Sequence, residues 1–183
     1  SKCTRLERLD LAYNKLTTPP DLSKCTRLER LDLAYNELTR PPDLSECTRL
    51  QWIRLHNNKL TTPPDLTRCT QLKWVRLSNN RLTSPPDLSK CTQLESLLLR
   101  NNELTHTPDL TRCTRLEEIS FNHNPNLQEL HISTGLLPGV THIGIRGTRI
   151  SQPQRDTLLA NCRRLRGNGA HMTLPLLISL WKT

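Results

Sequence analysis

The sequence has few aromatic residues and no long apolar segment. Trp, Tyr and Phe make up 3% of the 183 residues, and hydrophobic residues as a whole make up 34%. No stretch reaches the roughly 18 apolar residues that a membrane-spanning helix needs. We therefore expect no membrane span, and any buried core has to be filled mainly by aliphatic side chains.

The sequence also lacks the motifs that hold metals, phosphates or activated nucleophiles. Zinc sites bring cysteines in close pairs such as C-x₂₋₄-C, and no such pair occurs. The six histidines are scattered without metal-ligand spacing, and there is no glycine-rich phosphate loop and no nucleophile elbow. We therefore expect a protein that is not an enzyme and uses no cofactor or metal.

The sequence does contain a 22-residue unit that occurs six times. The six copies begin at Ser1, Ser23, Ser45, Thr67, Ser89 and Thr111. An internal period of 20–50 residues indicates a solenoid and needs to be recognised before any local pattern. One copy cannot bury its own leucines, so stacking of the copies has to create one continuous core.

Each copy follows the frame L-x-x-L-x-L-x-x-N-x-L, and its residues alternate in a way that predicts a short strand. In the first copy Leu9-Asp10-Leu11 places the leucines inward and Asp10 outward. Two prolines follow, which fix φ and favour an extended backbone. Leu22, Cys25 and Leu28 then recur every three residues, which suits a short turn of 3₁₀ type on the convex side.

The asparagine of the frame recurs once in every copy. Its short amide can bond neighbouring backbone groups, so stacked asparagines can form a ladder that satisfies buried peptide groups. The predicted ladder consists of Asn14, Asn36, Asn58, Asn80, Asn102 and Asn124.

Six of the seven cysteines also occupy one position of the repeat, between two leucines that we expect to be buried. They are Cys3, Cys25, Cys47, Cys69, Cys91 and Cys113. Free cysteine behaves as a small hydrophobic residue. We interpret these six as reduced core thiols, with cross-links or a metal as the alternative. Free buried thiols favour a reducing compartment, so we expect the protein in a cytosol.

The period changes after the sixth copy. A seventh unit ends at Ile150, with Thr148 in the asparagine position, and Ser151 then has the character of a helix N-cap. We divide the chain into a solenoid over residues 1–150 and a C-terminal helical cap over residues 151–183. Within this cap we expect the apolar segment Leu174–Trp181 to fold back onto the end of the coil, or else to dock against another domain.

Taken together, the leucine and asparagine frame, the prolines and the Cys-Thr step resemble the proline-containing leucine-rich repeats of bacteria. The unit N-x-L-T-x-x-P-D-L-S-x-C-T-x-L is most similar to repeats of chlamydia-like bacteria that live inside eukaryotic cells. The resemblance extends from Ser1 to about Ile150 and implies an α/β solenoid of seven repeats, with a parallel β-sheet on the concave face and a C-terminal helical cap. It also implies a secreted effector that binds host proteins in the host cytosol.

The strand residues between the leucines point outward on the concave face, so this face carries the candidate site. Trp52 and Trp74 are one repeat apart, and we expect their rings to stack on neighbouring strands about 4.8 Å apart. Trp, Tyr and Arg dominate interaction hot spots. The predicted partner-binding residues are Trp52, Arg54, His56, Trp74, Arg76, Arg100 and Tyr35. Alternatively, each tryptophan only shields its neighbour.

Two other functions remain open. The chain could be an inert scaffold, designed or natural, with no partner of its own. It could also bind an anionic surface or nucleic acid, although nucleic acid is disfavoured because no stacking platform or nucleic-acid motif accompanies the charge. The net charge is +9, and residues 141–183 carry seven Lys and Arg against one acidic residue, a net charge of +6. In the first two copies we expect Arg8 and Asp10 to neutralise Arg30 and Asp32 on the neighbouring strand.

Overall fold

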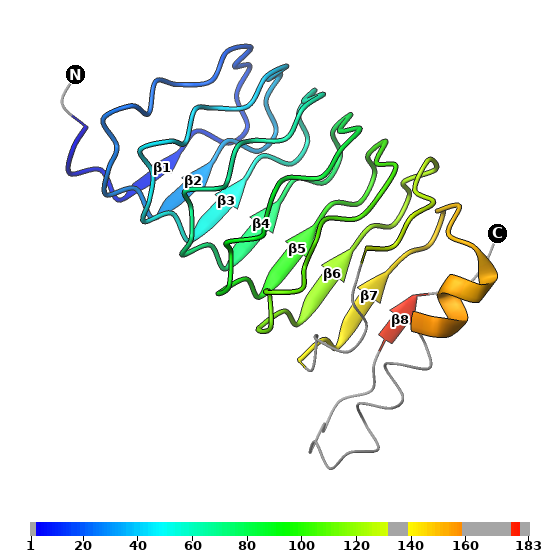
Figure 1. Ribbon diagram of the computed structural model, residues 1–183. Helices are drawn as coiled ribbons and strands as arrows, with labels where there is room; N and C mark the ends of the chain where they lie inside the picture. The colour runs from blue at the N-terminus through cyan, green and yellow to red at the C-terminus, as the bar shows by residue number, and fades with distance from the viewer. Residues whose placement is uncertain (1–2, 132–138, 159–176, 180–183) are drawn as a thin grey trace.

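The structure, a computed structural model, describes residues 3–131, 139–158 and 177–179. Within these residues the chain forms a succession of stacked coils that contribute their strands to a single parallel sheet (Figure 1). The strands are β1 (Arg8–Asp10), β2 (Arg30–Asp32), β3 (Trp52–Arg54), β4 (Trp74–Arg76), β5 (Ser96–Leu98), β6 (Glu118–Ser120), β7 (His142–Gly144) and β8 (Leu177–Ser179). The predicted seven-repeat solenoid with a parallel sheet is confirmed.

Each strand pairs with the next strand in the sequence without any crossover. The register pairs Trp52 with Trp74, one full repeat later, and the same shift of 22 residues holds from β1 to β6. Equivalent positions of successive repeats therefore lie side by side, about 4.8 Å apart. We call each set of equivalent positions along the stack a column.

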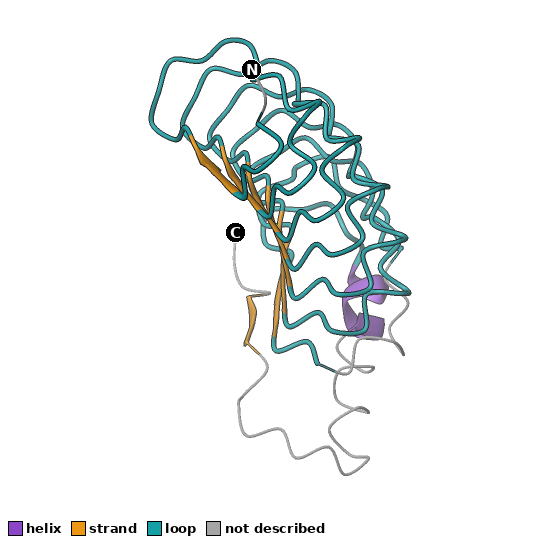
Figure 2. Ribbon diagram, turned by 90° about the vertical axis from the view of Figure 1, so that its left-hand side faces the viewer, coloured by secondary structure: helices purple, strands orange, loops and turns teal. Residues whose placement is uncertain are grey.

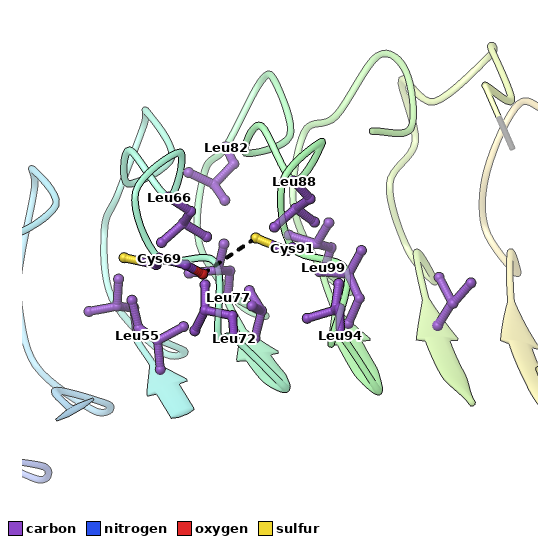
Figure 3. Packing of buried hydrophobic residues seen from close by; sticks show 14 of the residues in the cluster. Leu55, Leu66, Cys69, Leu72, Leu77, Leu82, Leu88, Cys91, Leu94 and Leu99 are labelled. Atoms are coloured by element: carbon purple, nitrogen blue, oxygen red, sulfur yellow. Dashed lines mark hydrogen bonds between the residues drawn. The ribbon is translucent and has the colours of Figure 1, made fainter. Parts of the chain in front are cut away.

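The core lies between the strands and the loops of the opposite side and is built mainly from leucine (Figure 3). The cysteines of copies two to six are free and buried inside it. Their thiols follow the stack, since Cys69 Sγ lies 3.6 Å from the Cys47 carbonyl and Cys91 Sγ lies 3.7 Å from the Cys69 carbonyl. The predicted core thiols are confirmed at these positions, and Cys162 lies outside the described residues.

The asparagine ladder is present and bonds the backbone of adjacent copies. The Asn80 amide donates to the carbonyls of Leu55 and Leu77, both at 3.0 Å, and its oxygen accepts the N–H of Leu60 at 3.0 Å. The same pattern occurs at Asn36, Asn58, Asn102 and Asn124. In the seventh repeat Thr148 keeps part of it, because its hydroxyl donates to the Ile145 carbonyl at 2.7 Å.

The convex side is formed by consecutive tight turns. The Cys25 N–H donates to the Leu22 carbonyl at 2.8 Å, and the Leu28 N–H donates to the Cys25 carbonyl at 3.1 Å, which are the three-residue steps expected from the spacing. The aspartate that follows the proline or the proline pair of each copy accepts a hydrogen bond that was not predicted from the sequence. The carboxylate of Asp21 accepts the N–H of Ser23 at 3.0 Å, and Asp43, Asp65, Asp87 and Asp109 repeat this turn.

One column has a left-handed backbone in every described repeat. It lies just before the ladder asparagine, and its φ values run from +55° to +68°. The column consists of Tyr13, Tyr35, Asn57, Asn79, Asn101, His123 and Gly147. Asn and Gly adopt this conformation readily, whereas it costs a tyrosine about 1–2 kcal/mol. The two tyrosines are therefore kept at the expense of backbone strain.

The C-terminal end combines a helix and a strand. A helix covers residues 152–158. The Gln154 side-chain oxygen accepts the Ser151 N–H at 3.3 Å, as in a capping box, and the Ser151 hydroxyl at 3.1 Å, which is consistent with Ser151 as the predicted N-cap. The helix lies on the side of the loops, away from the strands (Figure 2). Beyond residue 158 the described residues form β8, which extends the sheet parallel to β7. The sequence analysis expected a helical cap here and did not predict this strand.

The predicted boundary between residues 1–150 and residues 151–183 stays a prediction, although β8 shows that the second segment contributes to the same sheet. No helix in the described part of the chain is both long and apolar enough to cross a membrane.

Candidate functional site on the concave face

Trp52 and Trp74 occupy the first positions of β3 and β4 and are half-buried neighbours. Their ring centroids lie 4.5 Å apart, but the ring planes are inclined by 65°, so the rings meet edge to face. The expectation of stacked rings is wrong in this respect. The quadrupole of an aromatic ring favours such an arrangement over two faces in direct register.

Cationic side chains surround the tryptophan pair. The guanidinium carbon of Arg30 lies 4.3 Å from the ring centroid of Trp52, and that of Arg54 lies 5.6 Å away. The ammonium of Lys73 lies 5.8 Å from the ring centroid of Trp74. These distances are typical of cation–π contacts. The rings thus contact charged side chains on the surface and lie outside the leucine core.

The charges of the first two repeats are not balanced as expected. The register places Arg8 opposite Arg30, and Asp10 opposite Asp32, so like charges face each other. The negative charge of Asp32 is instead compensated by an arginine of the third repeat. Arg54 forms an ion pair with Asp32 at 3.1 Å, while Arg30 lies over Trp52.

The tryptophan pair separates two hollows of the concave face. The N-terminal hollow has a volume of about 310 Å³, and its lining includes Arg8, Asp10, Arg30, Asp32, Trp52 and Arg54. The C-terminal hollow has a volume of about 360 Å³, and its lining includes Arg76, Leu98, Arg100, Glu118, Ser120 and His142. A smaller hollow of about 70 Å³ is lined by both tryptophans, Arg54 and Arg76.

Aromatic rings also follow one rim of the face. Tyr13 and Tyr35 stack with centroids 4.3 Å apart and planes at 10°, and the ring of His56 meets Tyr35 edge-on at 5.3 Å. Tyr13 is 76% exposed and Tyr35 is 42% exposed. Tyr13 was missing from the predicted site, although it occupies the same repeat position as Tyr35.

From the third repeat onward the same rim carries amides. The Asn79 amide donates to the Asn57 side-chain oxygen at 3.0 Å, and the Asn101 amide donates to that of Asn79 at 2.6 Å. This second asparagine row lies outside the core ladder and was not predicted. The rim therefore changes from aromatic to polar along the solenoid.

His56 and Ser78 follow β3 and β4 and occupy one column. The Nδ1 atom of His56 and the hydroxyl oxygen of Ser78 are buried, and neither has a hydrogen-bond partner among the described residues. Burial lowers the pKa of His56, and Arg76, Arg54 and Arg100 lower it further, whereas Asp32 opposes this shift. The charged form of the imidazole is therefore disfavoured.

The structure groups the predicted site residues into three neighbouring sets. The small hollow of about 70 Å³ is lined by Trp52, Arg54, Trp74 and Arg76. Tyr35 and His56 are in contact on the rim. Arg100 lies with Arg76 in the C-terminal hollow.

The basic C-terminal end is only partly described. Arg155 is used internally, because its guanidinium donates to the carbonyls of Ile150 at 2.9 Å and Thr148 at 3.2 Å. Arg146 and Arg149 are exposed. Arg163, Arg164 and Arg166 lie outside the described residues.

The repeats match known repeat families. A family model of two leucine-rich repeats matches residues 4–46, and a model of a single leucine-rich repeat matches residues 71–91. Among curated proteins no sequence matches significantly. Together with the observed strands, these matches show that the chain has the leucine-rich-repeat solenoid fold.

Solved structures of bacterial leucine-rich-repeat proteins are similar to this chain. The functional domain of InlJ from Listeria monocytogenes, whose structure includes a cysteine ladder, is 26% identical with a TM-score of 0.69. YopM, a leucine-rich effector protein from Yersinia pestis, is 29% identical with a TM-score of 0.70. Both alignments cover 81% of this chain, but only 36% of the InlJ chain and 40% of the YopM chain. This chain thus spans well under half the length of these two structures.

Proposed function

We propose that the concave face binds a protein partner and that Trp52 and Trp74 form the centre of the contact. Leucine-rich-repeat solenoids commonly mediate protein–protein interaction and are generally non-catalytic. The observation that carries the proposal is the indole pair, which is half-buried on the surface and flanked by Arg30, Arg54 and Lys73. Two tryptophans placed there contribute nothing to the leucine core.

The proposed contact extends from this centre to its rim. Hot spots lie near the middle of an interface, inside a ring of residues that exclude water, and they are rich in Trp, Tyr and Arg. The proposed contact residues are Trp52, Arg54, Trp74 and Arg76 at the centre, with Tyr13, Tyr35, His56 and Arg100 around them. The two hollows on either side would receive side chains of the partner.

We also propose that the chain is the target-recognition part of a bacterial effector that acts in the cytosol of a host cell. The similarity to the effector YopM supports this role. The free buried thiols of five repeats favour a reducing compartment. The resemblance of the repeat unit to those of chlamydia-like bacteria points to the same way of life.

A comparison of captured proteins tests the proposed contact. The immobilised chain is exposed to eukaryotic cytosolic lysate, and a captured protein is then titrated against the wild type and the W52S/W74S variant. Serine is a suitable replacement because Ser96 occupies this column in the fifth repeat. We expect the variant to lose at least about 2 kcal/mol of binding free energy, roughly thirtyfold in affinity.

The matched control is R49Q/R115Q, because Gln71 and Gln93 occupy that exposed position in other copies. Unchanged affinity in W52S/W74S would overturn the proposed contact, and capture of no protein would favour an inert scaffold. Loss of binding in R146E/R149E, with W52S/W74S unaffected, would transfer the function to the basic end.

A further inference from the structure

The first coil leaves one edge of the sheet and one end of the core uncovered. β1 is the first strand in the order of the sheet, and among the described residues only β2 pairs with it. The leucines of this coil are only partly buried, whereas their equivalents one repeat later are at most 1% exposed. They are Leu6, Leu9, Leu11 and Leu16. A molecule that covered this end would therefore bury apolar surface that the described coils leave in water.

The outer edge of β1 offers the backbone groups of Arg8 and Asp10. The Leu11 N–H donates to the Asp32 carbonyl at 2.8 Å, so the odd-numbered positions of β1 face β2. Successive residues of a strand direct their N–H and C=O groups to opposite edges, so Arg8 and Asp10 direct theirs away from β2. Such an edge is a ready template for pairing with another chain.

The side chains of Arg8 and Asp10 determine which strand fits this edge. Both are exposed, and neither forms an ion pair within the described residues. A parallel strand of the same sequence, such as β2 on the inner edge, places arginine beside arginine and aspartate beside aspartate. An antiparallel copy of β1 centred on Leu9 instead places each arginine opposite an aspartate. Opposite charges on directly opposed residues stabilise a strand pair, whereas like charges destabilise it.

We propose that two copies of this chain associate through their β1 strands, which run antiparallel with the two Leu9 residues opposite each other. The N–H and C=O groups of Arg8 bond those of Asp10 of the partner subunit, and their side chains form ion pairs. The partly buried leucines of the two first coils meet, so the core continues across the contact. The same patch serves on both copies, so the interface is isologous and closes at a dimer.

The association also joins the two concave faces. The twofold axis of an antiparallel strand pair is perpendicular to the sheet, so both concave faces point to the same side. The N-terminal hollow, whose lining includes Arg8 and Asp10, therefore lies beside its own copy across the axis. The dimer presents the indole pair twice on one continuous surface. This inference goes beyond the proposed function, because it does not depend on the identity of any other partner.

Sedimentation velocity of the whole 183-residue chain tests the association. Between about 1 μM and about 100 μM, monomer should convert to dimer without larger species. R8D and D10R should each raise the dissociation constant at least about tenfold, because the symmetry sets like charges against each other on both sides of the axis. The matched controls are R49D and E46R, which make equivalent charge reversals at exposed positions of the third repeat and should leave the constant unchanged.

The double variant R8D/D10R distinguishes specific pairing from a general effect of charge. It exchanges the two charges, so opposite charges face each other again, and its dissociation constant should return to within about threefold of the wild-type value. It should not associate with the wild-type chain, because the mixed antiparallel pair brings like charges together. Native mass spectrometry of a mixture with isotope-labelled wild type measures the mixed dimer.

The single variants should keep the fold. R8D places a carboxylate opposite Arg30 within the same chain, and Arg54 and Arg76 occupy the column of Asp10 in later repeats, so this column accepts arginine. Urea denaturation at a concentration where all variants are monomeric checks this. R8D should unfold at the same urea concentration as the wild type or a higher one.

The remaining outcomes would each overturn the inference. A monomer at every concentration would leave this edge to a different chain segment. A dimer that neither R8D nor D10R weakens would lie elsewhere, and abundant mixed dimers of the wild type with R8D/D10R would show parallel strands. Species that keep growing with concentration would show head-to-tail stacking of β1 on β8. W52S/W74S should remain dimeric, so failure of the dimer and failure of the proposed function are distinguishable.

Discussion

The indole rings of Trp52 and Trp74 lie edge to face, with their centroids 4.5 Å apart and their planes at 65°. Two stacked rings would present a flat platform. The inclined pair instead presents the edge of one ring to the face of the other, and a small hollow of about 70 Å³ adjoins both tryptophans, Arg54 and Arg76. The centre of the concave face is therefore uneven, with a small hollow beside the indoles.

Replacing a ladder asparagine should destabilise the solenoid strongly. In N80A the Leu60 N–H loses its partner, and the carbonyls of Leu55 and Leu77 each lose one of two amide donors, because Asn58 and Asn102 still bond them. An unsatisfied buried group costs about 1–3 kcal/mol, so we expect a loss of this order in the free energy of unfolding. Denaturation with urea measures it.

N80T is the control for the ladder, because Thr148 fills this position in the seventh repeat and keeps one bond. It should recover part of the loss. An N80A variant within about 0.5 kcal/mol of the wild type, as for an ordinary surface substitution, would contradict the role of the ladder.

The repeat thiols should react slowly in the native protein. Burial raises the pKa of Cys69 and Cys91 to about 12, and that of Cys47 and Cys113 to about 11. The thiolate is the reactive species, so alkylation at pH 8 should be slow at these four residues and fast in guanidinium. Peptide mapping of the alkylated cysteines measures the rates. Rapid modification of several of them without unfolding would rule out a close-packed core.

The aspartates of the convex turns should make stability fall in acid. Hydrogen bonds from the residue two positions later, mainly from its N–H and in Asp65 first from the Thr67 hydroxyl, lower the pKa of each carboxylate. The unfolded chain then binds more protons than the folded chain near pH 4. The stabilisation is therefore present above this range and is lost as the pH falls through the lowered values.

Urea denaturation at pH 7 and pH 3 checks the acid effect. In D43N/D65N the amide oxygens still accept the turn bonds but no longer titrate. This variant should lose less stability between the two pH values than the wild type. An equal or greater loss would show that other groups cause the acid sensitivity.

His56 should titrate below the usual histidine pKa of about 6.5. Burial lowers its pKa first, and Arg76, Arg54 and Arg100 add to this, against the opposing effect of Asp32. Removing the negative charge in D32N should lower the pKa further, and R76Q should raise it. Two-dimensional NMR of the imidazole resonances measures each value. A wild-type pKa at or above 6.5 would contradict the described burial.

The leucine and asparagine frame predicted the solenoid, its core and its ladder because each of these follows from which positions repeat. The register then placed every outward residue in a column, so the predicted residues Trp52, Arg54, Trp74 and Arg76 do meet. What the sequence did not predict depends on angles and local competition. Three features have no signature in the repeat spacing. They are the inclination of the rings, the ion pair of Asp32 with Arg54 in place of the arginines of β1 and β2, and the left-handed column.

β8 was missed for a different reason. It joins β7 across a long stretch of chain, and its three residues belong to an apolar segment without a repeat frame. Short apolar runs do not distinguish a strand from a helix by periodicity. Its place in the sheet is set by the open edge of β7, which a local pattern does not reveal.

The constant register gives the concave face a fixed spacing along the solenoid. Successive strands lie about 4.8 Å apart, while an extended peptide advances about 3.3 Å per residue. Four repeat steps therefore span nearly the same distance as six peptide residues. Because the side chains of an extended strand alternate between its two faces, a partner strand laid across the sheet would return to the same phase with the same face only at every sixth residue, for example at Trp52 and four repeats later at His142. A partner bound in this way would have to match the spacing of its contact residues to that of the repeats.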